Sequence, residues 1–357
     1  MSQRRQRLLA FAGLLGLTGA AVHDLAALDP VPAAGSFALS ESDLRQLREG
    51  RIVVRMPDSP DRSEVVSFAA VRVRTSLARV REAMRDGEGR RGDEDVLELG
   101  GFGPNPSPSD LAALTLEAQD LKSLRRCRVG ECDMRVSAEV MERFQQEVAW
   151  SGRDSGAMAL SLWQAVLASY AHAYLQAGDA GLPLYHDNRD VTRVADSLAL
   201  LRPRFELLAR DCPDLYRYVA DFPGSRPEGA EDVLYWMKER FWRKTVTSLN
   251  HVSLLDRSDG QRPVLFVLSK QLYASHYFDS RLTLTIFAAD AAAPFLIQIS
   301  RARADIRPSG FTWVERLLLN RMLRGRLEHR LAGLRTRLEG GTQTPVVADT
   351  REETSRR

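Results

Sequence analysis

Hydrophobic and polar positions divide the chain into segments of different period. Residues 137–242 repeat at helical spacing, and prolines divide this block into short helices. Strand-like alternation occurs on both sides of the block. The predicted strands are 51–56, 65–74, 96–99, 114–116, 245–255, 264–278, 281–287 and 294–304. The pattern therefore predicts a β-rich protein interrupted by helices.

Two further helices have an apolar stripe. A short one covers 76–85 and ends at Asp86–Gly87. A long one runs from Trp313 to about Leu338, opens with a capping box of Thr312 and Glu315, and carries leucines on one side and arginines around them. Residues 340–357 are polar, and we expect them to be disordered.

The segment 264–287 has the most regular strand pattern. Its even positions are mainly apolar, whereas the odd positions from 269 to 285 are mainly polar. Lys270 and His276 interrupt the apolar series, and Tyr273 falls on the opposite side. Because 24 residues exceed a usual strand, we predict a turn at residues 279–281.

A lysine on a buried face has to be paired, neutralised or directed into a cavity. In the segment 295–303 the apolar odd positions continue into Arg301 and Arg303, so two neighbouring strands are predicted to direct cations into one interior. An apolar cavity with a cationic end suits a fatty acid, a lipid headgroup or another amphipathic anion. The alternative is a bulge that turns Lys270 outward.

The order of strands and helices resembles that of START-like (helix-grip) domains, in which a curved sheet wraps the last helix around an apolar cavity. The segment VVSFAAVRVRTSLARVREAMRD looks like the first strand and helix of that superfamily. The segments CRVGECDMR, YHDNRDVTRVAD, LYWMKERFW and SKQLYASHYFD together resemble a family of uncharacterised exported bacterial proteins. The second resemblance covers most of the chain and implies no activity.

The expected fold is α+β, with an antiparallel curved sheet packed on a long C-terminal helix and a large helical insertion. The predicted divisions are a signal peptide (1–22), a linker (23–50), a first α+β part (51–136), the helical insertion (137–244), a second α+β part with the final helix (245–339) and a tail (340–357).

The N-terminus has the pattern of a secretory signal. Residues 1–7 are basic, and residues 8–22 are apolar and end in small residues. About 15 apolar residues are too few to span a bilayer comfortably, although an uncleaved anchor is the alternative. We therefore expect a protein exported to the periplasm or the extracellular space.

The amino-acid composition gives no indication of a nucleic-acid partner. Net charge is only +3, and four of the 50 basic residues are lysines, which fits an arginine-rich genome better than a nucleic-acid surface. In an exported protein, Cys127 and Cys132 are expected to form a disulfide across the Val129–Gly130 turn, half a zinc site being the alternative, and Cys212 stays unpaired and buried.

No standard catalytic, nucleotide-binding or metal-binding motif is present, so we predict no catalytic residue, metal or cofactor. The favoured hypothesis is binding of a hydrophobic or amphipathic small molecule in a cavity between sheet and final helix. The predicted ligand-binding residues are Lys270, His276, Arg301, Arg303, His251 and Tyr273. An enzyme using His276, Lys270 and His251 as acid/base groups is one alternative. An envelope protein that contacts membranes through 313–338 is the other.

Overall fold

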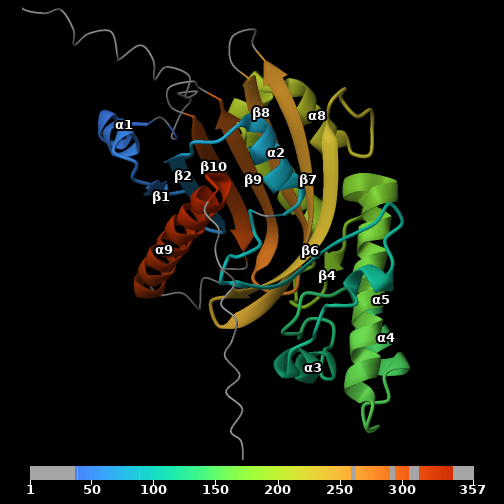
Figure 1. The fold of residues 1–357 in the computed structure, drawn as a ribbon. Coiled ribbons are helices and arrows are strands. Elements are labelled where there is room, and N and C mark those ends of the chain that lie inside the picture. Colours follow the sequence, from blue (N-terminus) through green and yellow to red (C-terminus); the bar gives the residue numbers. More distant parts are fainter. Residues whose placement is uncertain are drawn as a thin grey trace, which may run out of the picture. The chain divides into compact units, whose positions relative to one another are not determined.

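The structure, a computed structural model, describes residue 37 and residues 39–87, 89–258, 263–289, 294–304 and 313–340, without the side chains of 313–318. Within these residues eight strands form one antiparallel sheet in the order β1-β2-β10-β9-β8-β7-β6-β3, and two short strands pair separately. The fold is therefore α+β with a large antiparallel sheet and a C-terminal helix (Figure 1).

The elements have the following bounds. The large sheet consists of β1 (Val53–Arg55), β2 (Glu64–Arg72), β3 (Val96–Gly101), β6 (Glu231–Phe241), β7 (Lys244–Ser258), β8 (Pro263–Ala274), β9 (Phe278–Ala288) and β10 (Phe295–Ala304). The short pair is β4 (Leu184–Tyr185) and β5 (Thr192–Arg193). The α-helices are α1 (Glu41–Arg48), α2 (Leu77–Arg85), α3 (Ala118–Leu124), α4 (Ala138–Glu147), α5 (Ser155–Ala177), α6 (Val194–Leu201), α7 (Glu206–Asp211), α8 (Pro213–Asp221) and α9 (Trp313–Leu338). The 3-10 helices are η3 (Pro108–Leu111), η4 (Gly178–Gly181) and η5 (Arg202–Arg204).

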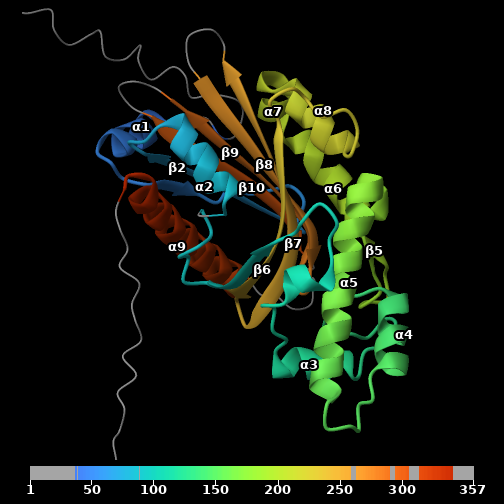
Figure 2. The same ribbon diagram turned by 45° about the vertical axis from the view of Figure 1, so that its right-hand side comes forward.

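Helices cover both faces of the sheet. In Figure 2, α2 and α9 lie on one side of the strands and α5, α6, α7 and α8 lie on the other. Leu331, Leu334 and Leu338 of α9 are buried in one apolar cluster with Val80 of α2 and Leu265 of β8. The C-terminal half of the leucine stripe is thus used for packing on the sheet.

The opposite face of the sheet packs on the helical block. Leu268 and Leu282 line one small cavity with Leu198 of α6, Leu208 of α7 and Phe205, the residue before α7. These strand residues belong to the even-numbered apolar series, which is nearly fully buried. The most apolar face of the strands therefore lies under the inserted helices, and the face with the polar series lies toward α9.

Most predicted elements are found, with local differences. The helices at 77–85 and 313–338 are confirmed, and Gly87 adopts the left-handed conformation (φ 72°) just after α2. The block predicted as helical contains strand β6, residues 114–116 form no strand, and the turn after β8 lies at 275–277 instead of 279–281. The 24-residue segment is two strands as expected, but the break comes where His276 interrupts the apolar series.

The remaining sequence predictions concern the two ends of the chain, the cysteines and membrane-spanning helices. The predicted signal peptide (1–22), most of the linker, Thr312 of the predicted capping box and nearly all of the tail lie outside the described residues. Cys127 and Cys132 lie at disulfide distance with their Cα atoms 4.5 Å apart, and Cys212 is a buried free thiol. Among the described helices none is long and apolar enough to cross a membrane.

Candidate functional site

Lys270 and His251 lie opposite each other on β8 and β7, under the helical block. The Lys270 Nζ donates to Asp179 Oδ1 at 2.6 Å and to the Val219 carbonyl oxygen at 2.9 Å. It also lies 5.0 Å from the centre of the Tyr174 ring. Desolvation lowers the pKa of Lys270, which Asp179 partly offsets. Lys270 is therefore a paired, buried cation on the face away from α9.

His251 belongs to a buried polar network with Asp232 of β6. Its Nε2 lies 2.9 Å from Asp232 Oδ1, and the Tyr174 hydroxyl lies 2.7 Å from its Nδ1. The Ser253 hydroxyl donates to the same Asp232 Oδ1 at 2.7 Å, and Tyr218 donates to Oδ2 at 2.6 Å. A neutral imidazole with its proton on Nε2 satisfies both ring contacts.

Burial controls the protonation of this network. Desolvation lowers the pKa of His251 below its usual 6.5, more than Asp232 raises it. Desolvation also acts to raise the pKa of Asp232, but the hydrogen bonds from His251, Tyr218 and Ser253 outweigh it and the pKa is lowered. The native state thus favours neutral His251 beside an ionised Asp232.

The other predicted residues are also engaged away from α9. His276 contacts Asp120 Oδ1 at 3.1 Å and the Asp133 carbonyl oxygen at 2.8 Å. Arg301 donates to Glu64 Oε1 at 2.7 Å, and Arg303 donates to Asp61. The expectation that these side chains line one cavity under the final helix is wrong, because their face of the sheet is the one that the helical block covers.

Tyr273 lies on the same side as Lys270, contrary to the prediction. The register of β7 and β8 shifts between Leu249 and Asn250, which pair with Tyr273 and Gln271. Such a bulge reverses the alternation of faces. The Tyr273 ring packs 5.8 Å from Trp163 of α5, and its hydroxyl donates to the Arg135 carbonyl oxygen at 3.0 Å. The alternative prediction was a bulge that turns Lys270 outward. A bulge does occur in β8, but it follows Lys270, which stays buried.

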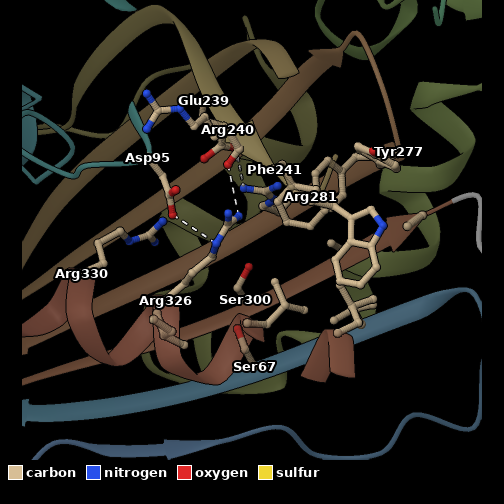
Figure 3. A pocket seen from close by; sticks show the side chains of 18 of the residues that line it. Ser67, Asp95, Glu239, Arg240, Phe241, Tyr277, Arg281, Ser300, Arg326 and Arg330 are labelled. Carbon is tan, nitrogen blue, oxygen red and sulfur yellow. Dashed lines mark hydrogen bonds and ion pairs between the residues drawn. The ribbon is translucent and has the colours of Figure 1, made fainter. Parts of the chain in front are cut away.

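A pocket does lie between the sheet and the final helix. Its volume is about 160 Å³, and β2, β6, β9, β10 and α9 contribute to its walls. Figure 3 shows Arg330, Asp95 and Glu239 toward one end and Tyr277 at the other, with Arg281 and Arg326 between them. Ser67 and Ser300 project from the strands into the same space (Figure 3). The pocket therefore has a charged end and an aromatic end.

Two arginines at this pocket have incomplete pairing. The Arg281 Nη1 lies 3.7 Å from Glu239 Oε1, beyond hydrogen-bond distance, and its guanidinium stacks 4.2 Å from the Phe278 ring centre. Arg330 donates to Gln298 Oε1 at 3.1 Å, and no described carboxylate forms an ion pair with it. Desolvation, followed by the charge of Arg90, lowers the pKa of Arg330.

The desolvation also lowers the pKa of Arg281, although guanidinium groups remain charged at neutral pH. In contrast, Arg326 is well paired: its Nε lies 3.2 Å from Asp95 Oδ2, and its Nη1 donates to the Arg240 carbonyl oxygen at 3.1 Å. Two half-buried cations thus lie at the pocket without a carboxylate at hydrogen-bond distance among the described residues. An anion placed between them would supply acceptors.

The remaining walls are mainly apolar. The apolar lining residues are Met56, Val65, Phe241, Trp242, Phe278, Ala302, Ala304, Leu319, Leu323 and Leu327. Phe241 packs 4.8 Å from Phe278 and 5.5 Å from Tyr277, measured between ring centres. These side chains come from β2, β6, β9, β10, the β6–β7 turn, the segment after β1 and α9, and they offer a surface for an alkyl or aromatic group.

Two aromatic lining residues have an unfavourable backbone. Among the described non-glycine residues, Trp242 (φ 55°) and Tyr277 (φ 63°) alone have positive φ. Trp242 is the first residue of the two-residue turn between β6 and β7, a position where glycine is preferred when φ is positive. Such strain costs about 1–3 kcal/mol and is concentrated at functional sites. Both strained residues lie at the same pocket.

The sequence signal for this pocket lies in the polar series of the strands, whereas the predicted ligand-binding residues lie mainly in the apolar series. Arg281 belongs to the odd-numbered polar series of 264–287, and Gln298 and Ser300 belong to the polar series of 295–303. Arg326 and Arg330 stand among the arginines that surround the leucine stripe of the final helix. No sequence pattern indicated Trp242, because the positive φ of a turn residue is not visible in its identity.

The described residues contain no group of histidine, cysteine, aspartate and glutamate arranged to hold a metal ion. Comparison of the chain with protein-family models, with curated proteins and with solved structures finds no match. The function is therefore inferred from the geometry of the site.

Proposed function

We propose that the protein binds an amphipathic anion in the pocket between the sheet and α9. Arg281 and Arg330 would hold the acidic group, with Gln298 and Ser300 as further polar contacts. The apolar part would lie among Phe241, Leu323 and the other apolar lining side chains. Carboxylate and phosphate groups both fit the guanidinium chemistry.

One observation carries this proposal: two half-buried arginines, neither with a carboxylate at hydrogen-bond distance among the described residues, border the same pocket as apolar side chains. A pocket for a neutral ligand would gain nothing from two half-buried cations, because their partial loss of hydration costs free energy. A solvated salt bridge would have placed Arg281 within hydrogen-bond distance of Glu239, but the atoms lie 3.7 Å apart. An anionic ligand explains both features.

We further propose that the arrangement is a START-like (helix-grip) fold with α3–α8 and their connections as an elaboration, and that the protein acts outside the cytoplasm. A sheet that packs on a long last helix with a pocket between them supports the first proposal. The apolar N-terminal sequence and the cysteine pair at disulfide distance support the second.

The geometry does not favour the enzyme hypothesis. Lys270 and His276 are bonded to different carboxylates, Asp179 of η4 and Asp120 of α3. The small cavity beside Lys270 has a volume of about 20 Å³, and neither His251 nor His276 lines it. The three groups therefore do not meet at one open pocket where a substrate could contact them.

The direct test compares an acid with the matching neutral molecule. Isothermal titration calorimetry with dodecanoate should give one saturable site, whereas dodecanol, which has the same chain and no charge, should bind at least tenfold more weakly. Native mass spectrometry should show one dodecanoate per chain. Equal affinity for both molecules would remove the anionic part of the proposal, and binding of neither would remove the proposal.

A further inference from the structure

A separate hollow lies where α3 meets the first turn of α5. In both Figure 1 and Figure 2, α3 lies beside the end of α5 that follows the α4–α5 connection. The hollow has a volume of about 590 Å³, and its walls are Leu121 and Lys122 of α3, Arg125 and Arg126 just after it, Trp150 of the connection and the start of α5. It shares no lining residue with the pocket between the sheet and α9, so it is an independent surface.

Three cations in the walls of this hollow have no carboxylate partner. Lys122, Arg125 and Arg126 are exposed, and none of them forms an ion pair with a described residue. Among the described residues, no carboxylate lines the hollow. The chain between Asp120 and Glu131 has four basic residues and no acidic one. The hollow is therefore a positively charged patch that the fold itself does not neutralise.

The arginine-rich composition of the chain does not explain this patch. Arginines of the other helices pair with an acid within about one turn, as Arg143 does with Glu147 at 2.7 Å. The exposed Arg153 and Asp154 next to the hollow offset each other's charge. Lys122 differs from the three other lysines of the chain, each of which forms an ion pair with a carboxylate: Lys238, Lys244 and Lys270. The cations of the hollow are thus left for a partner of opposite charge.

Trp150 gives the hollow an apolar wall. Its Nε1 donates to the Phe144 carbonyl oxygen at 2.9 Å, so the indole has no free polar group for a ligand in the hollow. Met158, in the first turn of α5, is 40% exposed and adds apolar surface at this end of the helix. Cations beside a tryptophan and other apolar side chains are typical of surfaces that contact the headgroup region of a membrane.

The exposure of the three cations favours an extended anionic surface over a single small anion. Exposed charges remain hydrated and are screened by salt, so one phosphate group held among them would gain little. A membrane that contains anionic lipid presents many negative groups together, and each lysine or arginine close to it strengthens binding about fivefold. An open hollow with a tryptophan beside its cations therefore fits a lipid surface.

We propose that the protein docks on anionic lipid membranes through this α3–α5 surface. Lys122, Arg125 and Arg126 contact the lipid headgroups, and Trp150 adds an apolar contact beside them. The interaction is peripheral and electrostatic. It goes beyond the proposed function because it uses another surface, and it differs from the alternative expected from sequence, in which residues 313–338 contact the membrane.

The experiment is co-sedimentation of the full chain with phosphatidylcholine vesicles that contain about one-third phosphatidylglycerol, an anionic lipid, and with vesicles of phosphatidylcholine alone. In the hollow variant, Lys122→Gln/Arg125→Gln/Arg126→Gln, partition onto the anionic vesicles should fall at least tenfold. The matched control, Arg193→Gln/Arg210→Gln/Arg217→Gln, removes the same charge from exposed arginines that pair with aspartates, and should lose less than threefold. Every chain keeps residues 1–22, so vesicle binding by that segment is the same in all of them.

Salt and competing anions identify the partner. Binding to the anionic vesicles should weaken steeply between about 0.1 and 0.5 M sodium chloride, because the Debye length falls. Inorganic phosphate of equal ionic strength should release no more protein than sodium chloride does, and greater release would assign the hollow to a single phosphate group. Tighter binding of poly-glutamate than of anionic vesicles would assign it to an acidic protein. Either result would overturn the proposal.

The loss of binding must also be specific to the hollow. Equal losses in the two triple variants, or equal partition of the unmodified chain onto both kinds of vesicle, would overturn the proposal. Unchanged binding of the hollow variant together with a loss in Arg321→Gln/Arg324→Gln, which removes two exposed arginines, would place the contact on α9 instead. The hollow variant should remain folded in thermal unfolding, because its three side chains are exposed and form no ion pairs with described residues. It should bind dodecanoate as the unmodified chain does, so failure of the membrane contact would leave the proposed function standing.

Discussion

The Arg281 guanidinium lies over the Phe278 ring, 4.2 Å from its centre, and stays 3.7 Å from the nearest oxygen of Glu239. The charged group is thus held by an aromatic face and lacks a close acceptor. Cation–π contacts contribute about 0.5–2 kcal/mol, less than the desolvation of a guanidinium requires. The pair Arg281–Phe278 joins the charged and the aromatic parts of the pocket.

Replacement of Arg281 by methionine should weaken binding of dodecanoate at least tenfold, equivalent to about 1.4 kcal/mol. Methionine keeps much of the apolar stem, so the loss reports the charge. Because Arg281 is an ion-pair partner of the buried Glu239, its removal should also lower the melting temperature, and binding is therefore measured well below the unfolding transition. Titration calorimetry and thermal unfolding measure the two quantities.

The control for this variant is Arg217→Met. Arg217 is 70% exposed and pairs with Asp214 on α8, away from the α9 pocket. Its replacement should leave dodecanoate affinity unchanged. A loss of affinity in Arg217→Met equal to that in Arg281→Met would mean that general surface charge, and not the pocket, attracts the ligand.

The strain at Trp242 predicts an unusual stability order. Trp242→Gly should be more stable than Trp242→Ala by about 1 kcal/mol, because both lose the indole and only glycine adopts φ near 55° without cost. Urea unfolding of the two variants measures the difference. Equal free energies of unfolding would contradict the assignment of backbone strain to this turn.

The sequence predicts correctly those elements whose hydrophobic spacing fits only one type of secondary structure. The 26-residue helix Trp313–Leu338 follows directly from its leucine spacing, and the strands that follow residue 244 follow from alternation. The alternation of apolar and polar residues assigns each side chain to one of the two faces of the sheet. It does not show which helices cover each face. Because the helical block buries the apolar series, Lys270, His251 and Arg301 were placed in the wrong layer, and Arg281 and Ser300 were overlooked.

The surroundings of the remaining site residues could not be predicted, because they depend on contacts between residues far apart in the sequence. Asp179, which pairs with Lys270, is separated from it by 91 residues, and Asp120, which contacts His276, by 156. The bulge that turns Tyr273 toward Trp163 depends on how β8 pairs with β7, not on local composition. A lysine or histidine in an apolar series therefore indicates a buried partner at least as well as it indicates a ligand.

Asp232 should be important for stability, because it accepts hydrogen bonds from His251, Ser253 and Tyr218. Asp232→Asn should lower the free energy of unfolding by about 2–3 kcal/mol, since buried donors lose an ionised acceptor. Asp196→Asn, whose side chain is 75% exposed, should change it by less than about 0.5 kcal/mol. Equal effects would mean that the network does not hold the layers together.

The same network predicts a pH dependence. Because the pKa of His251 is lowered in the native state, the unfolded chain binds more protons once the pH falls below about 6.5. Stability should therefore be constant above this pH and decrease below it, by up to about 1.4 kcal/mol per pH unit, until the native-state pKa is reached. Urea unfolding between pH 5 and 8 measures this slope.

Substitutions identify the residue responsible. In His251→Gln the slope between pH 5 and 7 should be reduced, even if the variant is less stable overall. His172→Gln removes an exposed histidine of α5 and should leave the slope unchanged. An unaltered slope in His251→Gln would assign the pH dependence to other groups.

The most direct test of the central claim fills the pocket. Ser300 projects from β10 into the space between the sheet and α9, and Ser300→Leu would occupy part of the 160 Å³ volume with apolar atoms. Titration calorimetry with dodecanoate should show one site in the unmodified chain and in Thr336→Leu, a change on the exposed side of α9, but no binding in a folded Ser300→Leu variant. Unchanged binding to Ser300→Leu, or no binding to the unmodified chain, would contradict the account.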